Sequence, residues 1–184
     1  ICNLSVIATT FSAILNAISS PSMAQGPANK KKLFAVVCLI CGISVRNIFI
    51  KNLCEKLNGN TLCLFQLVDK HGVLLYNEIK KFDRKVFFVY GGTNTQTRED
   101  IRSITENEKD AIIVASFGTF STGINIPSLE NVIFASPSKS KIRNLQSIGR
   151  GLRLKEGKTS CNLFDLADDL HWKSWKNHTL NHAA

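Results

Sequence analysis

Residues 146–153 hold the side chains of this sequence that are best suited to binding an anion. In a helix, Gln146, Arg150 and Arg153 lie on one stripe, because residues three and four positions apart share a face. Each arginine offers planar, bidentate donors and keeps its charge, so two of them one turn apart can grip a phosphate. The spacing predicts an anion clamp. A solvated basic face on an amphipathic helix is the alternative that these residues alone leave open.

The same helix has an apolar stripe, which we expect to face the core. Its members are Ile142, Leu145, Gly149 and Leu152. Apolar residues at this spacing typically pack on a neighbouring element. The glycine among them is expected to let that neighbour approach closely. We therefore expect a helix that is buried through this stripe and projects the arginines from its other stripe.

The charge of the chain is concentrated around this helix. The formal net charge is +9 over 184 residues, which favours an anionic partner. Residues 131–160 contain seven Lys and Arg against the single acidic Glu156, whereas the signs nearly cancel over residues 83–110. The composition is ordinary for a globular domain, which argues against wholesale disorder. This distribution favours a phosphate-bearing ligand over a uniformly basic surface.

Cysteine and histidine patterns predict neither a disulfide framework nor a metal site. The six cysteines lack framework spacing, and Cys38 and Cys41 have no second pair at zinc-ligand spacing. We expect reduced, buried thiols and a reducing compartment such as the cytoplasm. No cysteine or carboxylate lies at matched ligand spacing around the histidines near the carboxyl terminus. Those histidines are His171, His178 and His182.

Short apolar runs alternate with helical patterns from residue 46 onward. This order predicts an α/β fold, a parallel sheet with helices on its faces. Thr95 or Thr97 is the expected N-cap of the third helix. The expected strands are 61–68, 85–90, 111–115, 131–135 and 161–166, and the expected helices are 47–57, 71–82, 97–107 and the clamp helix.

Residues 1–45 are an unassigned segment in this interpretation. They carry no charged residue before Lys30, but polar residues interrupt the apolar run too often for a membrane span. A fragment anchored in a membrane through this segment is an alternative that we consider and do not favour. The main domain is expected over 46–170, followed by a tail over 171–184, with the chain truncated at both ends.

The loops after the expected strands are rich in small, hydroxyl and basic residues. In parallel sheets, ligands meet the loops at the carboxyl ends of the strands, and such a surface suits a phosphate backbone. In the third loop, Ser121, Thr122 and Gly123 could present hydroxyl and N–H groups to a phosphate. An ordinary polar connection is the alternative for that loop. The four loops are 66–72, 91–96, 116–127 and 136–141.

A segment that superficially suggests a P-loop follows the clamp helix. It runs from Gly151 and ends in Gly157, Lys158 and Thr159, with five residues between the glycines where the motif needs four. A P-loop also follows a strand and opens a helix, which is the reverse of the order here. We interpret the segment as a basic turn and expect no unaided nucleotide hydrolysis.

Four segments of the chain together resemble superfamily 2 DNA helicases. The pattern Gln146-x-x-Gly149-Arg150-x-x-Arg153 resembles motif VI, and residues 121–127 resemble motif V. The strand at 62–66 resembles motif IV, and the turn at 90–92 resembles the segment called IVa. The amino-acid sequence of residues 46–182 is similar to that of the UvsW-type phage helicases.

The resemblance implies the C-terminal RecA-like lobe of a two-lobed motor. In that family ATP and Mg²⁺ lie between the lobes, and the N-terminal lobe supplies the P-loop and the magnesium motif. At the matched positions, Arg150 and Arg153 are the implied catalytic arginines, and Gln146, Gly123 and Asn125 the implied nucleotide-binding residues. Asn125 stands where many relatives carry Asp. The implied DNA-binding residues are Gln66, Gly92, Ser121, Thr122, Lys139 and Lys141.

The implied activity is ATP-driven remodelling of branched DNA or RNA–DNA hybrids in the cytoplasm of a phage host. The implied partners are DNA and the N-terminal lobe of the same protein, with no membrane partner. This lobe alone is expected to be inactive, because it lacks the P-loop. A stand-alone nucleic-acid-binding α/β module without an ATPase role is the alternative.

Overall fold

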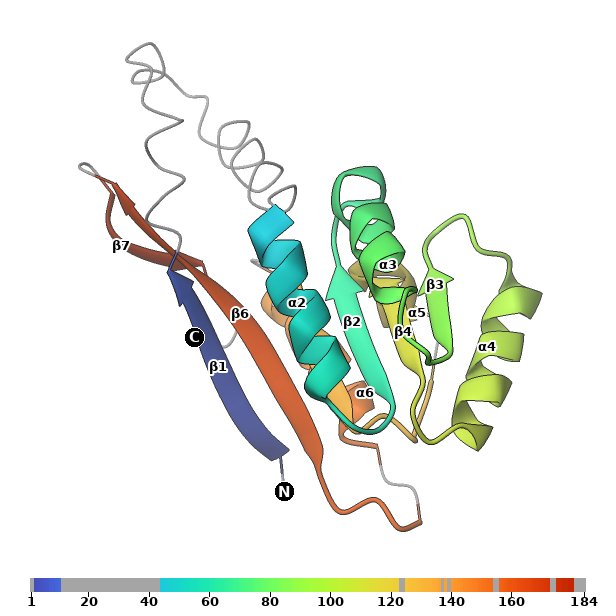
Figure 1. The fold of residues 1–184 in the computed structure, drawn as a ribbon. Coiled ribbons are helices and arrows are strands. Elements are labelled where there is room, and N and C mark those ends of the chain that lie inside the picture. The colour runs from blue at the N-terminus through green and yellow to red at the C-terminus, as the bar shows by residue number, and fades with distance from the viewer. Residues whose placement is uncertain are drawn as a thin grey trace.

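The predicted α/β fold with a parallel sheet and helices on both faces is confirmed by the computed structural model (Figure 1). The fold is therefore the one that the alternation of strand and helix patterns predicts. The structure describes residues 2–10, 44–122, 125–136, 138, 140–153, 156–172 and 175–180.

The strands follow the order β1-β6-β5-β2-β4-β3, and every neighbouring pair in this order is parallel. Strand β7 pairs with β6 in the antiparallel direction. The five expected strands are present, with β6 longer than expected. Strand bounds are β1 Cys2–Thr10, β2 Thr61–Phe65, β3 Val86–Val89, β4 Ile112–Ser116, β5 Asn131–Phe134, β6 Cys161–Trp172 and β7 Trp175–Leu180.

Two strands lie where the sequence was not interpreted as regular structure. Strand β1 lies in the unassigned segment and pairs with β6 from Cys2–Cys161 to Thr10–Asp169. Its first residues alternate apolar Cys2 and Leu4 with polar Asn3, a pattern typical of a strand. Strand β7 lies in the expected tail.

Helices cover both faces of the sheet. Helices α2 and α3 pack on one face, and α4, α5 and α6 on the other, as Figure 1 shows for α2 and α6. The prediction of a loop over 116–127 is wrong in part. Helix α5 begins at Phe117, and the rings of Phe117 and Phe120 are buried in the core. Bounds are α2 Ser44–Lys56, η3 (a π-helical turn) Val68–Gly72, α3 Val73–Ile79, α4 Thr95–Asn107, α5 Phe117–Thr122 and α6 Lys141–Gly151.

The N-cap of α4 differs from the prediction. Asn94 caps the helix, and its side-chain oxygen accepts a hydrogen bond of 2.7 Å from the backbone N–H of Thr97. Asn is among the strongest N-cap residues, because its short side chain reaches an N–H that the first turn leaves unpaired. Thr95 is instead the first residue of the helix.

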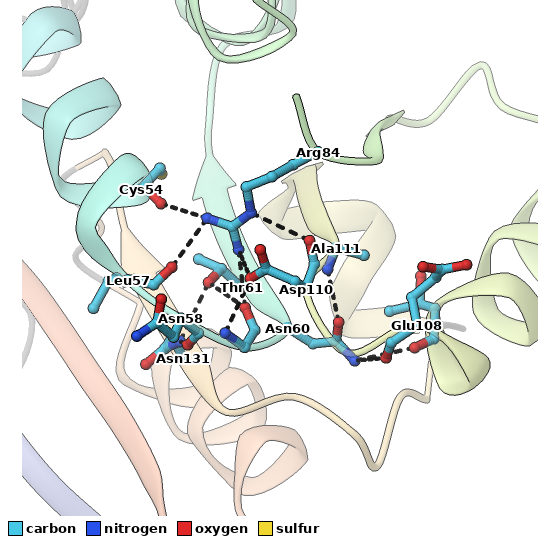
Figure 2. Close-up of polar contacts among 12 residues, drawn as sticks. Cys54, Leu57, Asn58, Asn60, Thr61, Arg84, Glu108, Asp110, Ala111 and Asn131 are labelled. Atoms are coloured by element: carbon cyan, nitrogen blue, oxygen red, sulfur yellow. Dashed lines mark hydrogen bonds and ion pairs between the residues drawn. The ribbon is translucent and has the colours of Figure 1, made fainter. Parts of the chain in front are cut away.

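Arg84 joins the end of α2 to the amino edge of the sheet (Figure 2). Its guanidinium donates to the carbonyls of Cys54 at 2.8 Å, Leu57 at 3.0 Å and Gly59 at 3.1 Å, and it pairs with the carboxylate of Asp110. The carbonyls at the end of a helix have no partner within the helix. One planar cation therefore satisfies the end of α2 and fixes the turn into β2.

Asn60 holds the same edge from its other side (Figure 2). Its amide nitrogen donates to the carbonyls of Thr105 at 3.0 Å and Glu108 at 2.8 Å, and its oxygen accepts from the N–H of Ala111 at 2.8 Å. The end of α4 and the starts of β2 and β4 are thus tied to one buried side chain.

A second buried network lies at the carboxyl edge. The hydroxyl of Ser136 accepts from the N–H of Gln66 at 3.2 Å and shares a hydrogen bond of 2.7 Å with Nδ1 of His71. Buried Arg46 donates from two nitrogens to the carbonyl of Ala135, at 3.1 and 2.7 Å. Burial, and secondarily the charge of Arg46, lower the pKa of His71 to about 3. His71 is therefore neutral at pH 7 and holds the segment after β2 in place.

The packing of α6 corrects the prediction about its buried face. The expected stripe points outward, with Ile142, Leu145 and Leu152 at 70%, 58% and 45% exposure. A Cβ added at Gly149 would meet nothing within 4 Å, so this glycine is not a point of close approach. The buried residues of α6 are instead Asn144, Ser147 and Gly151.

Gly151 is the point at which α6 meets the sheet. A Cβ there would lie 2.9 Å from Cγ2 of Val132 on β5 and 3.1 Å from Sγ of Cys161 on β6. Both distances are shorter than ordinary van der Waals contact, so a larger residue would push the helix away. Val132 and Cys161 lie at the starts of their strands, so α6 ends against the amino edge.

We predict opposite effects for alanine at the two glycines of α6. Gly151→Ala should lower the free energy of unfolding by about 1–3 kcal/mol, because the added methyl group meets Val132 and Cys161. Gly149→Ala should leave it unchanged or raise it by up to about 1 kcal/mol, because alanine favours a helix and space is open. Urea unfolding of the chain measures both. Equal destabilisation by the two substitutions would contradict this packing.

His71 predicts a specific dependence of stability on pH. Its pKa is about 3 in the folded state against an ordinary 6.5, so the unfolded state binds the extra proton between these values. The contribution of His71 is fully present above pH 6.5 and is lost as the pH falls toward 3, at up to about 1.4 kcal/mol per unit. His71→Gln should remove this slope. Unfolding curves at several pH values between 7 and 4 measure the slope for the wild type and the variant. Parallel pH profiles of these two proteins would rule out the contribution of His71.

Candidate functional site

Helix α6 carries Gln146 and Arg150 of the predicted clamp but ends before Arg153. Ser140 is its N-cap and accepts from the N–H of Arg143 at 3.4 Å, and the last helical residue is Gly151. Arg153 therefore lies just past the helix. Its N–H donates to the carbonyl of Arg150 at 3.3 Å, so the chain continues for another turn. Arg153 remains one turn beyond Arg150, as the spacing predicts.

The outward side of α6 carries two adjacent stripes. At about 100° per residue, Leu145, Gln146 and Gly149 lie away from the buried face, and Arg150 lies at its border. Gln146 and Arg153 are exposed, and Arg150 is half-buried. The helix thus presents a polar, cationic stripe beside an exposed apolar one, with nothing within the described residues covering Gly149.

Arg150 links α6 to α5. Its Nη1 donates to the carbonyl of Phe120, and its guanidinium carbon lies 5.4 Å from the centre of the Phe120 ring. Burial lowers the pKa of Arg150, and the charge of Arg153 contributes in the same direction. The two guanidinium groups therefore repel each other, and an anion placed between them relieves that repulsion. Sequence reasoning missed Phe120, whose aromatic ring gave no signal of this contact.

The predicted nucleotide-binding residues are only partly placed. Gln146 lies exposed on α6, beside the two arginines. Asn125 lies half-buried in the segment after α5, and its Oδ1 is buried with no hydrogen-bond partner among the described residues. That oxygen is a buried acceptor in the segment that resembles motif V. Gly123 lies outside the described residues.

The predicted DNA-binding residues that the structure describes gather at the carboxyl edge of the sheet. Gln66 is exposed directly after β2, Gly92 lies in an exposed turn after β3, and Lys141 is the exposed first residue of α6. Ser121 and Thr122 close α5, which follows β4. Lys139 lies outside the described residues.

Three residues of the predicted DNA-binding set, Gln66, Gly92 and Lys141, lie at the opposite edge of the sheet from the arginines. Helix α6 starts at the carboxyl edge with Lys141 and ends at the amino edge with Gly151, about 16 Å away. The arginines lie in its last turn and just beyond, whereas Gln66 lies at the far edge. The structure therefore brings the arginines together with Gln146 and, through the bond from Arg150 to the carbonyl of Phe120, with the end of α5 that carries Ser121 and Thr122. Helices α5 and α6 connect the arginines with the DNA-binding set.

The described residues show neither a metal cluster nor a membrane-spanning helix. Within them, no group of three or more His, Cys, Asp or Glu side chains could hold a metal ion. No helix in this part of the chain combines the length and apolar character that crossing a membrane requires. Cys38 and Cys41 lie outside the described residues, and Cys54, Cys63 and Cys161 are buried thiols.

Comparisons with known proteins identify the family. The sequence pattern described as "Helicase conserved C-terminal domain" matches residues 44–155. The chain is 42% identical over 133 residues to the ATP-dependent DNA helicase uvsW of Enterobacteria phage T4, covering 71% of this chain and 26% of that protein. It is 29% identical over 111 residues to the putative ATP-dependent helicase IRC3 of Saccharomyces cerevisiae, covering 60% and 16%. The chain thus spans about a quarter of the length of the phage relative and a smaller share of the yeast protein.

Solved structures agree with this assignment. The crystal structure of T4 UvsW matches with a TM-score of 0.68 and 28% identity, over 98% of this chain and 36% of that one. The C-terminal part of the Fun30 ATPase domain matches with a TM-score of 0.58 at 20% identity, over 67% and 41%, which speaks for the fold alone. The parallel sheet and its helices are the RecA-like fold of helicase C-terminal lobes. The chain therefore belongs to the superfamily 2 helicases, as a C-terminal lobe of the helicase conserved C-terminal domain family.

Proposed function

We propose that this lobe supplies Arg150 and Arg153 to the phosphates of ATP held by the N-terminal lobe of the same protein. The observation that carries the proposal is the grouping at the end of α6, where Gln146 and Arg153 are exposed and half-buried Arg150 lies at the flank of the helix toward α5. The mutual repulsion of the arginines fits a polyphosphate, because its negative charge lies where two cations meet.

The exposed apolar stripe supports coverage of α6 by another lobe. Ile142, Leu145 and Leu152 lie beside the arginines and on the same outward side. Exposed apolar patches of this kind often mark interaction surfaces. A lobe that covers them excludes water from the arginines, and charge stabilisation is stronger in a site without water.

ATP, when bound, supplies the phosphoryl group that is transferred to water. The guanidinium groups of Arg150 and Arg153 stabilise the charge that develops on that group, and an arginine in this role contributes about 10³–10⁵ in rate. Gln146 orients the arginine helix or contacts the nucleotide, and Asn125 offers its buried oxygen, which has no hydrogen-bond partner within the described part of the chain. The N-terminal lobe holds Mg²⁺ in this proposal.

The carboxyl edge is the proposed track for DNA. Gln66, Gly92 and Lys141 line it, and the remaining predicted contacts belong to the same track. Backbone and hydroxyl groups there contact phosphates without reading sequence. We extend the proposal to remodelling of branched DNA or RNA–DNA hybrids in a host cytoplasm, on the likeness to the UvsW-type helicases. The remaining predicted contacts are Ser121, Thr122 and Lys139.

Alanine substitutions in the full-length protein test the arginine role. Arg153→Ala and Arg150→Ala should each lower DNA-stimulated ATP hydrolysis by about 1000-fold or more, with DNA affinity largely unchanged. Arg102→Ala, which removes a surface arginine of α4 paired with Glu99, is the matched control and should leave hydrolysis unchanged.

The same measurements separate the proposal from a stand-alone nucleic-acid-binding module. A module of that kind predicts weaker, salt-sensitive DNA binding in the arginine variants and no effect on nucleotide turnover. Hydrolysis at the wild-type rate in both variants would refute the arginine role.

A further inference from the structure

Lys158 lies at a junction between three backbone segments. Its ammonium donates to the carbonyls of Gly151 at 2.6 Å, Pro127 at 3.1 Å and Arg153 at 3.2 Å. An ammonium group has three N–H donors and no acceptor, so these carbonyls use its full capacity. The side chain is half-buried, and burial lowers the pKa of Lys158.

Each of the three carbonyls belongs to a segment of the proposed site. Gly151 ends α6 and packs against β5 and β6. Arg153 is the exposed arginine of the clamp. Pro127 ends the segment that carries Asn125 and leads from α5 toward β5. Lys158 therefore connects the end of the arginine helix to the motif V segment, 31 residues away in sequence.

An ordinary helix cap accounts for only part of this arrangement. Cations near the end of a helix commonly bond its last carbonyls, as Lys158 does with Gly151. The bonds to Pro127 and Arg153 reach acceptors outside α6. They fix the backbone of Arg153, which lies past the helix and also donates its N–H to the carbonyl of Arg150. These contacts therefore restrain Arg153, a residue beyond the end of the packed helix α6.

We propose that Lys158 is a positioning residue for the phosphate-binding arginines. By holding the carbonyls of Arg153, Gly151 and Pro127 around one cation, it fixes the direction in which the Arg153 side chain leaves the backbone. The inference rests on the proposed function, in which Arg153 reaches ATP. A shift of about 1 Å in such a group is sufficient to cost about 100-fold in rate. Lys158 acts through Arg153 and touches no reacting atom.

Substitution in the full-length helicase tests this role. Lys158→Met keeps an apolar stem of similar length and removes all three donors. It should lower kcat for DNA-stimulated ATP hydrolysis by about 10- to 100-fold at temperatures well below its Tm, with the KM for ATP and the DNA affinity changed by less than about 3-fold. Lys158→Arg keeps the charge but arranges its donors in a plane, so an intermediate loss is expected. Lys109→Met, at an exposed lysine of the loop before β4, is the matched control and should equal wild type.

A double substitution separates positioning from a purely structural role. Combined with Arg153→Ala, Lys158→Met should cause no further loss of kcat, because Lys158 acts through Arg153. A lower Tm with normal kcat, or losses that multiply in the double variant, would overturn the proposal. If Lys158→Met does not fold, Lys158→Arg in both backgrounds gives the same comparison. If kcat falls in Arg153→Ala but in neither Lys158 variant, only this inference is refuted. If kcat is normal in Arg153→Ala, the proposed function itself is refuted.

Discussion

The close contact of α6 with the sheet at Gly151 is the constraint on which the rest of the site depends. Without a side chain there, the helix approaches Val132 and Cys161 at the amino edge of β5 and β6. This contact sets the rotation of α6 about its axis. With Gly151 against the sheet, Arg150 lies about 100° around the helix from it, at the flank that faces α5, where it reaches the carbonyl of Phe120. The direction of the arginines is therefore a consequence of packing behind them.

Backbone carbonyls bonded to buried or half-buried cations hold much of this lobe together. Arg84 ends α2, Arg46 bonds the carbonyl after β5, and Lys158 bonds the segments around the end of α6. Each cation sits where a helix or strand leaves carbonyls without partners. Because side chains far apart in sequence meet at these points, the amino and carboxyl edges of the sheet are fixed relative to each other.

The fold was predictable from the sequence because alternating apolar runs and helical patterns persist from residue 46 onward. The rotation of α6 about its axis was not predictable from the sequence, because Asn144 and Ser147 are polar yet buried. Ser147 bonds the carbonyl of Arg143 at 2.9 Å, and Asn144 bonds that of Ser138 at 3.3 Å, so both can enter the core. Hydrophobic spacing then assigns the wrong stripe and the wrong glycine. Contacts such as those of Lys158 join residues too far apart in sequence for spacing to reveal them.

The central claim is that Arg153 contacts ATP held by the other lobe. The most direct measurement is a structure of the full-length protein with DNA and a non-hydrolysable ATP analogue. The guanidinium of Arg153 should lie within about 3 Å of a phosphate oxygen, with Leu145 covered by the N-terminal lobe. A bound nucleotide with Arg153 facing solvent and Leu145 still exposed would contradict the claim.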